Sequence, residues 1–304
     1  MVDTIFYWVV NMTVASSLTG LVIALLSMIK KIPRRVVSIL WAIPFIRMAL
    51  PFGISSKYSA AALINKIFTK TTPFISVVPS ELGGITEMNY IKGANTYYPI
   101  IQYKKEFPSD LFRVCGIVWA LVAAALFIAF LIIYIVTMRE IKDAKPIGDR
   151  VYLSDKVTVP AVYGMIKPRI ALPEETDDDR YILMHERTHI KRGDNVFRVL
   201  SLAVVCVHWF NPLCWLYLKM YYTDNELACD EAVTAKLTAE EKKEYARAIL
   251  SSSERVSVFV PAFGGAKVRV RIENILSFKK ITAASAISFV ALILVLAYFL
   301  LTNA

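Results

Sequence analysis

Charged residues, glycines and cysteines are all scarce in this sequence of 304 residues. Charged residues make up 20%, there are 11 glycines and 4 cysteines, and 56% of the residues are hydrophobic. Soluble domains contain about 25% charged and about 45–50% apolar residues, so an ordinary cytosolic globule is excluded. The same balance excludes a disordered chain, and the few glycines and cysteines exclude a collagen-like chain and a disulfide scaffold.

What the sequence has instead is four long stretches with few or no charges, over residues 4–29, 36–56, 114–138 and 281–304. A helix needs about 20 apolar residues to cross a bilayer, and each stretch supplies them. The second stretch is the weakest, because Pro44 and Pro51 bend it and Arg47 interrupts it. Arg47 would have to snorkel, pair or face the helix bundle. We therefore expect an α-helical membrane protein with four transmembrane helices.

Basic residues near the ends of these stretches predict the orientation of the chain. The net charge is +10, and in a membrane protein such an excess marks cytoplasmic loops more often than nucleic-acid binding. The basic residues that flank the stretches are Lys30, Lys31, Arg34, Arg35, Arg139, Lys142, Lys145, Lys279 and Lys280. The positive-inside rule places them in the cytoplasm and both termini outside the cell. We expect a multi-pass protein of the plasma membrane that makes no direct contact with nucleic acid.

This orientation divides the chain into five regions. Residues 1–56 hold the first two transmembrane helices with a short basic inner loop, and residues 57–110 form an extracellular loop. Residues 111–138 form the third transmembrane helix and residues 281–304 the fourth. Residues 139–280 form a cytosolic domain, in which short β-prone runs predict a small sheet and most of the rest is predicted to be helical.

The cytosolic domain contains the pattern H-E-x-x-H, from His185 to His189. Residues four apart on a helix project from one face, so both imidazoles can bind one Zn²⁺ at about 2.0–2.1 Å. Glu186 lies beside the first ligand, where it can take a proton from the attacking water. The pattern uses two of only three histidines, which favours a metal site over incidental surface histidines. We predict His185 and His189 as metal ligands and Glu186 as the catalytic base.

The helix that holds this pattern has recognisable start and stop signals. Thr176 can cap its first turn, and the acidic residues 177–179 complement the positive end of the helix dipole. Lys191 and Arg192 suit the last turn, and Gly193 suits the position that ends the helix. A helix with both signals supports the placement of the two histidines on one face.

A third ligand is predicted from the apolar run that follows. Residues 199–218 carry no charge, but Asn211-Pro212 breaks the run, so we interpret residues 194–236 as a membrane-associated helical hairpin. At about 1.5 Å per residue, the returning arm brings Glu226 back beside the histidine helix. Asp230 shares the face of Glu226 and is predicted to orient a ligating histidine. The four cysteines are interpreted as core residues.

Four sequence blocks, taken in order, resemble the BlaR/MecR-type family of bacterial integral-membrane zinc metallopeptidases. The blocks are G-M-I-K-P-R-I-A-L-P at 164–173, H-E-R-T-H with R-G-D at 185–194, W-F-N-P at 209–212 and E-L-A-C-D-E at 226–231. The resemblance implies a gluzincin-type α+β zinc protease domain between the third and fourth spans. It also implies that His185, His189 and Glu226 bind zinc and that Glu186 is the base.

The resemblance further implies a function in signalling, in which a signal outside the cell activates proteolysis inside it. The expected substrates are a cytosolic DNA-binding repressor of the BlaI/MecI type and the protease itself, within the regulation of β-lactam resistance. Known members carry an outer penicillin-binding sensor domain after the fourth span. This chain ends at Ala304, so β-lactam binding is not assigned to it. The partners expected are the lipid bilayer, the protein substrate and a second copy in a homodimer.

Several questions stay open at the level of the sequence. Arg169, Ile170, Ala171 and Leu172 could pair with an extended substrate strand or could be structural only. The candidates for stabilising the oxyanion are Tyr245, Arg247 and Arg271, and residues 251–267 are a candidate loop for self-cleavage. Two other functions fit the same residues: a housekeeping membrane zinc protease for quality control or processing, and a non-enzymatic receptor in which zinc is structural.

Overall fold

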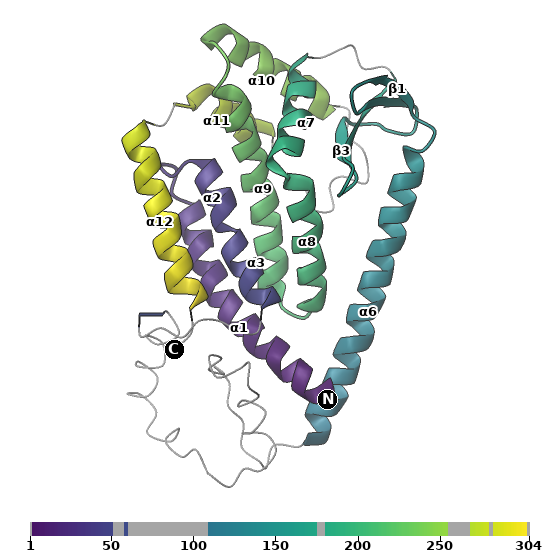
Figure 1. The fold of residues 1–304 in the computed structure, drawn as a ribbon, viewed down its shortest axis with the longest axis vertical. Coiled ribbons are helices and arrows are strands. Elements are labelled where there is room, and N and C mark those ends of the chain that lie inside the picture. The colour runs from purple at the N-terminus through teal and green to yellow at the C-terminus, as the bar shows by residue number, and fades with distance from the viewer. Residues whose placement is uncertain are drawn as a thin grey trace.

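The computed structural model of the chain describes residues 2–50, 58–59, 109–174, 180–254, 268–279 and 282–302. A bundle of helices fills one end, and a small sheet with further helices fills the other (Figure 1). Most of the extracellular loop expected over 57–110, the helix start expected at 176–179 and most of the loop 251–267 lie outside the described residues.

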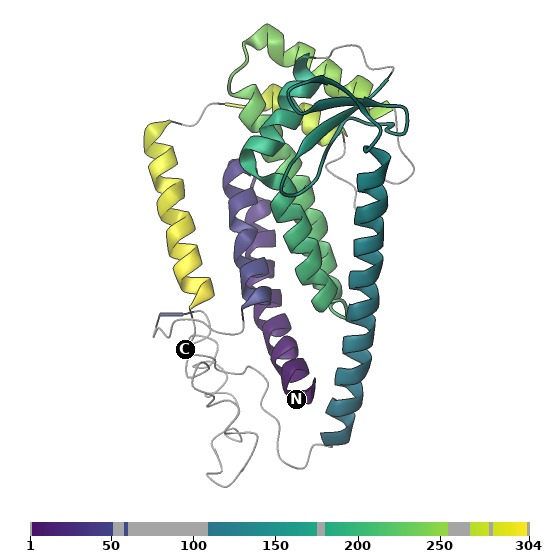
Figure 2. The ribbon, with the colours of Figure 1, turned by 45° about the vertical axis from the view of Figure 1, so that its right-hand side comes forward.

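Three of the described helices are long and apolar enough to cross a membrane: α1 (Val2–Ser27), α6 (Ser109–Glu140) and α12 (Ala283–Leu301). Helix α1 is half-buried among other helices, whereas α6 and α12 bury few of their side chains. Figure 2 shows these two helices on opposite sides of the bundle. An apolar surface of this extent suits the hydrocarbon core of a bilayer. The protein is therefore mostly helical, with three candidate membrane spans and a small sheet domain.

The second expected span differs from the expectation. In its described part the chain forms two short helices, α2 (Arg34–Leu40) and α3 (Ala42–Ala49), separated at Trp41. The break has a local cause, because Pro44 has no amide proton to donate to the carbonyl of Leu40. Arg47 is buried and donates a hydrogen bond to the carbonyl of Leu301, at 3.3 Å. Arg47 therefore faces the bundle, and a count of four spans stays a prediction.

The small sheet has four strands: β1 (Lys145–Gly148), β2 (Val151–Ser154), β3 (Ala161–Tyr163) and β4 (Arg169–Pro173). Their order in the sheet is β1-β2-β4-β3, with β2 and β4 parallel and the other two pairs antiparallel. Strand β4 is thus central, and β1 and β3 are the edges. Helix α7 (Arg180–Arg192) packs against β3 and β4.

The helices after α7 form the frame of the inner part of the molecule. They are α8 (Asp194–Val207), α9 (Pro212–Thr234), α10 (Ala239–Glu254) and α11 (Val268–Ser277). Gly193, with a φ of 72°, ends α7 as its position predicts and lets α8 start at once. The side chain of Asn211 caps α9 by accepting a hydrogen bond from the amide of Leu213, at 3.0 Å. Helices α8 and α9 form an antiparallel pair (Figure 1).

The largest apolar cluster joins α9 to the N-terminal helices. Trp41 and Tyr217 are fully buried there, and their rings lie 5.8 Å apart. Gly20 lets Tyr217 pack directly against α1, because a Cβ at this position would overlap the tyrosine ring. The hydroxyl of Tyr217 donates to the carbonyl of Ser17, at 2.8 Å. This packing holds α9 in place against α1 and α2.

Candidate metal centre

Helix α7 presents His185 and His189 on one buried face. Both side chains are 4% exposed, their rings are perpendicular, and the ring centroids lie 4.6 Å apart. The two Nε2 atoms are 3.1 Å from each other. This is the arrangement that a spacing of four residues on a helix predicts.

The other nitrogen of each ring has a hydrogen-bond partner that fixes its orientation. His189 Nδ1 lies 2.7 Å from a carboxylate oxygen of Asp194. His185 Nδ1 lies 2.9 Å from the hydroxyl of Tyr245 and 3.3 Å from a carboxylate oxygen of Asp230. A proton on each Nδ1 donates outward to these partners, so each Nε2 is left to point into the site.

The hairpin α8–α9 brings Glu226 to the same point. One oxygen of its carboxylate lies 3.4 Å from His185 Nε2, and the other lies 3.5 Å from His189 Nε2. The two nitrogens lie 3.1 Å apart, so the carboxylate of Glu226 spans the histidine pair with one oxygen near each ring. A tetrahedral Zn²⁺ with bonds of about 2.0–2.1 Å has donor atoms about 3.3 Å apart. The spacing of the three residues therefore suits a single cation.

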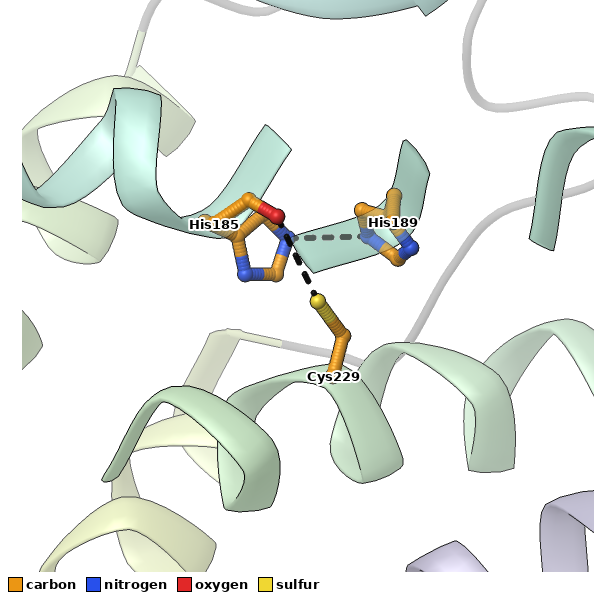
Figure 3. A group of neighbouring side chains, drawn as sticks. All are labelled: His185, His189 and Cys229. Atoms are coloured by element: carbon orange, nitrogen blue, oxygen red, sulfur yellow. Dashed lines mark hydrogen bonds between the residues drawn. The ribbon is translucent and has the colours of Figure 1, made fainter. Parts of the chain in front are cut away.

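Cys229, on α9, faces the same two histidines. Its sulfur and one ring nitrogen of each histidine all lie within 4.8 Å of one another. Figure 3 shows the sulfur pointing toward the gap between the two rings. The sequence interpretation placed Cys229 in the core without a function. The signal that marks it is its position one helical turn after Glu226, on the same side of the helix.

Two arginines that come from other elements reach into the centre. Arg271, on α11, donates two hydrogen bonds of 2.8 Å to Asp230, and its Nη2 lies 3.2 Å from His185 Nε2. Arg198, on α8, pairs with the carboxylate of Glu226. Arg271 was one of three candidates for the oxyanion, whereas sequence reasoning did not find Arg198 or Asp194. Asp194 belongs to the R-G-D block that follows the histidines, which is the signal that could have marked it. No local pattern marks Arg198, because its contact with Glu226 joins two separate helices.

The electrostatic field of the centre favours positive charge between its ligands. Burial lowers the pKa of His185, but Cys229, Tyr245 and Asp230 outweigh it and raise that pKa well above its usual value. Burial raises the pKa of Glu226, but His189 and Arg198 outweigh it and hold that pKa well below its usual value. A field that stabilises a protonated imidazole also stabilises a metal cation in its place.

Glu186 and Asp230 differ in their surroundings. Glu186 directly follows His185 on α7, is 9% exposed, and has no hydrogen-bond or ion-pair partner among the residues that the structure describes. Asp230 is fully buried between Tyr245 and Arg271, and although burial raises its pKa, Arg271 outweighs this and lowers the pKa to about 2. The Tyr245 hydroxyl is held between His185 and Asp230, and Arg247 is exposed.

The residues proposed as a substrate-binding strand need a correction. Arg169, Ile170, Ala171 and Leu172 lie in β4, which pairs with β2 on one side and with β3 on the other. Strand β4 is therefore flanked on both sides and is not an edge to which a strand could be added. The edge strand that packs against α7 is β3.

A chain of hydrogen bonds connects the centre to the N-terminal helices. Asp194, which orients His189, accepts hydrogen bonds from Nε of Arg192 at 3.2 and 2.9 Å. Another nitrogen of Arg192 donates to Asn225 Oδ1 at 2.9 Å, and the hydroxyl of Ser38 on α2 donates to the same oxygen at 3.1 Å. The position of a predicted metal ligand thus depends on contacts that reach α2.

Comparisons with known proteins identify relatives of this chain. A family model described as BlaR1 peptidase M56 matches residues 7–275. The methicillin resistance mecR1 protein of Staphylococcus aureus (strain Mu50) is 34% identical over 106 residues, which cover 33% of this chain and 18% of that protein. The regulatory protein BlaR1 of Bacillus licheniformis is 32% identical over 117 residues, which cover 36% of this chain and 20% of that protein. The matched part is about a fifth of the length of these relatives.

Proposed function

The chain belongs to the BlaR1 peptidase M56 family of metallopeptidases, and from this we propose that it is a membrane-embedded zinc endopeptidase of a signalling system. The match confirms the resemblance that the four sequence blocks indicate. Relatives named for methicillin resistance and for regulation support a function in resistance signalling. The single observation that supports the zinc peptidase most directly is the convergence of the two Nε2 atoms of His185 and His189 with the carboxylate of Glu226.

The donor set fits zinc in its chemistry as well as its spacing. Imidazole nitrogens and a carboxylate oxygen are usual ligands of catalytic zinc, and carboxylates behind the imidazoles fix their tautomers. His185, His189 and Glu226 would hold the ion, with Asp230 and Asp194 orienting the two histidines. When bound, zinc would supply the Lewis acidity that polarises a peptide carbonyl and activates water.

Glu186, Arg271 and Tyr245 would have separate functions in proton transfer, oxyanion stabilisation and ligand orientation. Glu186 would take a proton from the attacking water and deliver it to the leaving amine. Arg271 is the best placed of the oxyanion candidates, because its guanidinium lies 3.2 Å from His185 Nε2 and its side chain is 15% exposed. Tyr245 would instead orient His185, since its hydroxyl is already bonded on both sides.

The proposed orientation puts this centre on the cytoplasmic side. The basic residues after α1, after α6 and before α12 belong to helix ends that all lie at the end of the molecule that holds α7, α10 and the sheet (Figure 1). Under the positive-inside rule, that end faces the cytoplasm. The substrate would then be a cytosolic protein, for which we propose a repressor of the BlaI/MecI type, with the peptidase itself as a second substrate.

The test uses the full-length protein purified in detergent. We expect about one zinc per chain by elemental analysis, and cleavage of a winged-helix repressor that stops with a chelator and returns with zinc. Absence of bound zinc would overturn the proposal. Bound zinc without cleavage of any candidate would favour the receptor, and cleavage of casein at a rate equal to that of the repressor would favour the housekeeping protease.

A further inference from the structure

The surroundings of Cys229 are unlike those of a structural cysteine. Cys214, on the same helix, is also fully buried, but it packs in the apolar cluster that contains Trp41 and Tyr217. Cys229 is fully buried too, yet its neighbours are the imidazoles of His185 and His189 and the carbonyl oxygen of His185, at 3.5 Å. A buried cysteine usually packs as a small apolar residue. Here the sulfur is directed at the atoms that would bind a metal (Figure 3).

The position of Cys229 follows from that of Glu226. The two residues lie three apart on α9, so one face of the helix directs both side chains toward α7. Helix α7 in turn supplies the two imidazoles. Two helices thus bring a carboxylate and a thiol to the same pair of imidazole nitrogens.

We propose that Cys229 is a fourth protein donor to the metal, which closes the site to water and substrate in the conformation seen here. The inference rests on the proposed zinc peptidase and adds a means of regulating it. Zinc sites with four protein donors are closed, whereas catalytic sites keep one position open. Coordination would release the thiol proton, and water would have to displace the sulfur before a peptide bond could be cleaved.

Opening this site requires movement of α9 relative to α7. The sulfur and the histidines belong to these two different helices, and α9 is held by α1 and α2 through Asp224 and Tyr217. A shift of the N-terminal helices would therefore change the distance between Cys229 and the imidazoles. The bond between the thiol and the metal would then break or form according to the position of the membrane helices.

Cobalt(II) provides a direct test in the full-length protein. A thiolate bound to cobalt gives a charge-transfer absorption in the near ultraviolet, which nitrogen and oxygen ligands do not give. We expect this band in the wild type and in C214A, the matched control on the same helix, and its loss in C229A and C229S. Zinc affinity, measured by competition with a chelator, should fall at least about tenfold in C229A and remain unchanged in C214A.

The outcomes separate this inference from the proposed function. Stoichiometric cobalt without the thiolate band in the wild type would overturn the inference and leave the zinc peptidase intact. Persistence of the thiolate band in C229A would also overturn the inference and leave the zinc peptidase intact. Failure of every variant to bind cobalt or zinc would overturn both. Absence of the band from the wild type is decisive by itself, and this outcome does not depend on the folding of any variant.

Peptidase activity tests the closing effect of the thiol. Because sulfur and water compete for one position, the wild type keeps partial activity, and C229A loaded with zinc should be several-fold more active. C214A should match the wild type. A C229A protein that holds zinc but cleaves more slowly than the wild type would contradict the proposal that the thiol inhibits cleavage.

Discussion

Helix α9 carries two buried acidic faces that differ in how their carboxylates are satisfied. On the anchoring face, formed by Asp224 and Glu231, the carboxylate oxygens meet hydrogen-bond donors of the N-terminal helices. Asp224 accepts from Ser27, Trp41 and Arg34, each at 2.9 Å. Glu231 accepts from the first two backbone amides of α2, at 3.0 and 3.2 Å. The carboxylates of this face therefore have their hydrogen-bond partners without a metal cation.

On the metal face, formed by Glu226, Cys229 and Asp230, the carboxylates also meet donors, because Asp230 accepts from Tyr245 and Arg271 and Glu226 pairs with Arg198. What differs is that two imidazoles of α7 converge on this face. The Nε2 atoms of His185 and His189 face each other at 3.1 Å and both also face Glu226. At most one proton can lie between the two nitrogens, so their lone pairs converge on a point that suits a positive ion. The comparison teaches that a buried acid on α9 does not by itself mark function. Nitrogen lone pairs that converge on one point indicate the functional site instead.

The largest expected effect concerns Glu186, which belongs to the metal face but not to the ligand set. E186Q should reduce peptide cleavage by about 100- to 10,000-fold, because the amide cannot accept the proton of water. Its zinc content should equal that of the wild type, as measured by elemental analysis. E240Q, on the exposed surface of α10, is the matched control and should keep full activity. Full activity in E186Q would remove Glu186 as the base.

The second prediction separates the two faces by their metal affinity. E226A removes a proposed ligand and should weaken zinc binding by about 100-fold or more, as measured by chelator competition. D224A, two residues earlier on the same helix, should bind zinc as the wild type does. If E226A retains its zinc, the third donor is another residue.

The third prediction separates the two faces by their stability. D224A leaves Trp41, Ser27 and Arg34 without their buried acceptor, and we expect a loss of about 3 kcal/mol in the free energy of unfolding. A thermal melt in detergent measures the effect as a lower Tm. D143A breaks the exposed pair with Lys156 and should change stability by less than about 0.5 kcal/mol. Equal Tm values for the two variants would argue against the anchoring face.

A smaller effect is expected at Asp194. D194N keeps the shape of the side chain but removes the carboxylate that orients His189, at 2.7 Å. Zinc affinity should then fall about tenfold, since partners of ligating histidines typically contribute this much. Competition with a chelator measures the change, and an unaltered affinity would show that the Nδ1 contact does not matter for metal binding.

The smallest effect is expected at Asn225, which lies between the two faces. N225A removes the oxygen that accepts hydrogen bonds from Arg192 and Ser38, at a cost of about 1 kcal/mol in stability. Tm should fall slightly, and cleavage should change far less than in E186Q. A loss of zinc as large as in E226A would mean that the connection to α2 controls the centre more strongly than its geometry suggests.

Local patterns were sufficient for much of the fold and for part of the centre. The H-E-x-x-H spacing predicted the convergence of His185 and His189, and the residue type at Gly193 predicted the end of α7. These features depend on residues within one helical turn, where backbone geometry alone decides which side chains meet. The second span was harder to predict, because composition does not show that Pro44 divides it into α2 and α3.

The other partners of the centre could not be predicted in this way. Arg271 reaches it from a helix that is far from His185 in the sequence, and Arg198 reaches it through a contact with Glu226 on another helix. Cys229 resembled a core residue until its neighbours were known. The substrate strand was placed on β4 because sequence does not give strand order. That order puts β4 in the middle of the sheet, with its backbone groups already paired.

By itself, the amino-acid sequence determined the apolar helices, the two histidines on one face and the break at Asn211-Pro212, because each follows from residues that are close along the chain. The sequence also indicated Glu226 and Asp230 as the acids near the histidines, but only the tertiary structure decided that Cys229 faces the same histidines and that Asp224 and Glu231 meet the N-terminal helices. That choice depends on the packing of Tyr217 against Gly20 and Trp41, which sets the rotation of α9 and so directs Glu226 and Cys229 toward α7. A rotation of this kind is the result of many contacts between distant segments, and no single stretch of sequence contains it.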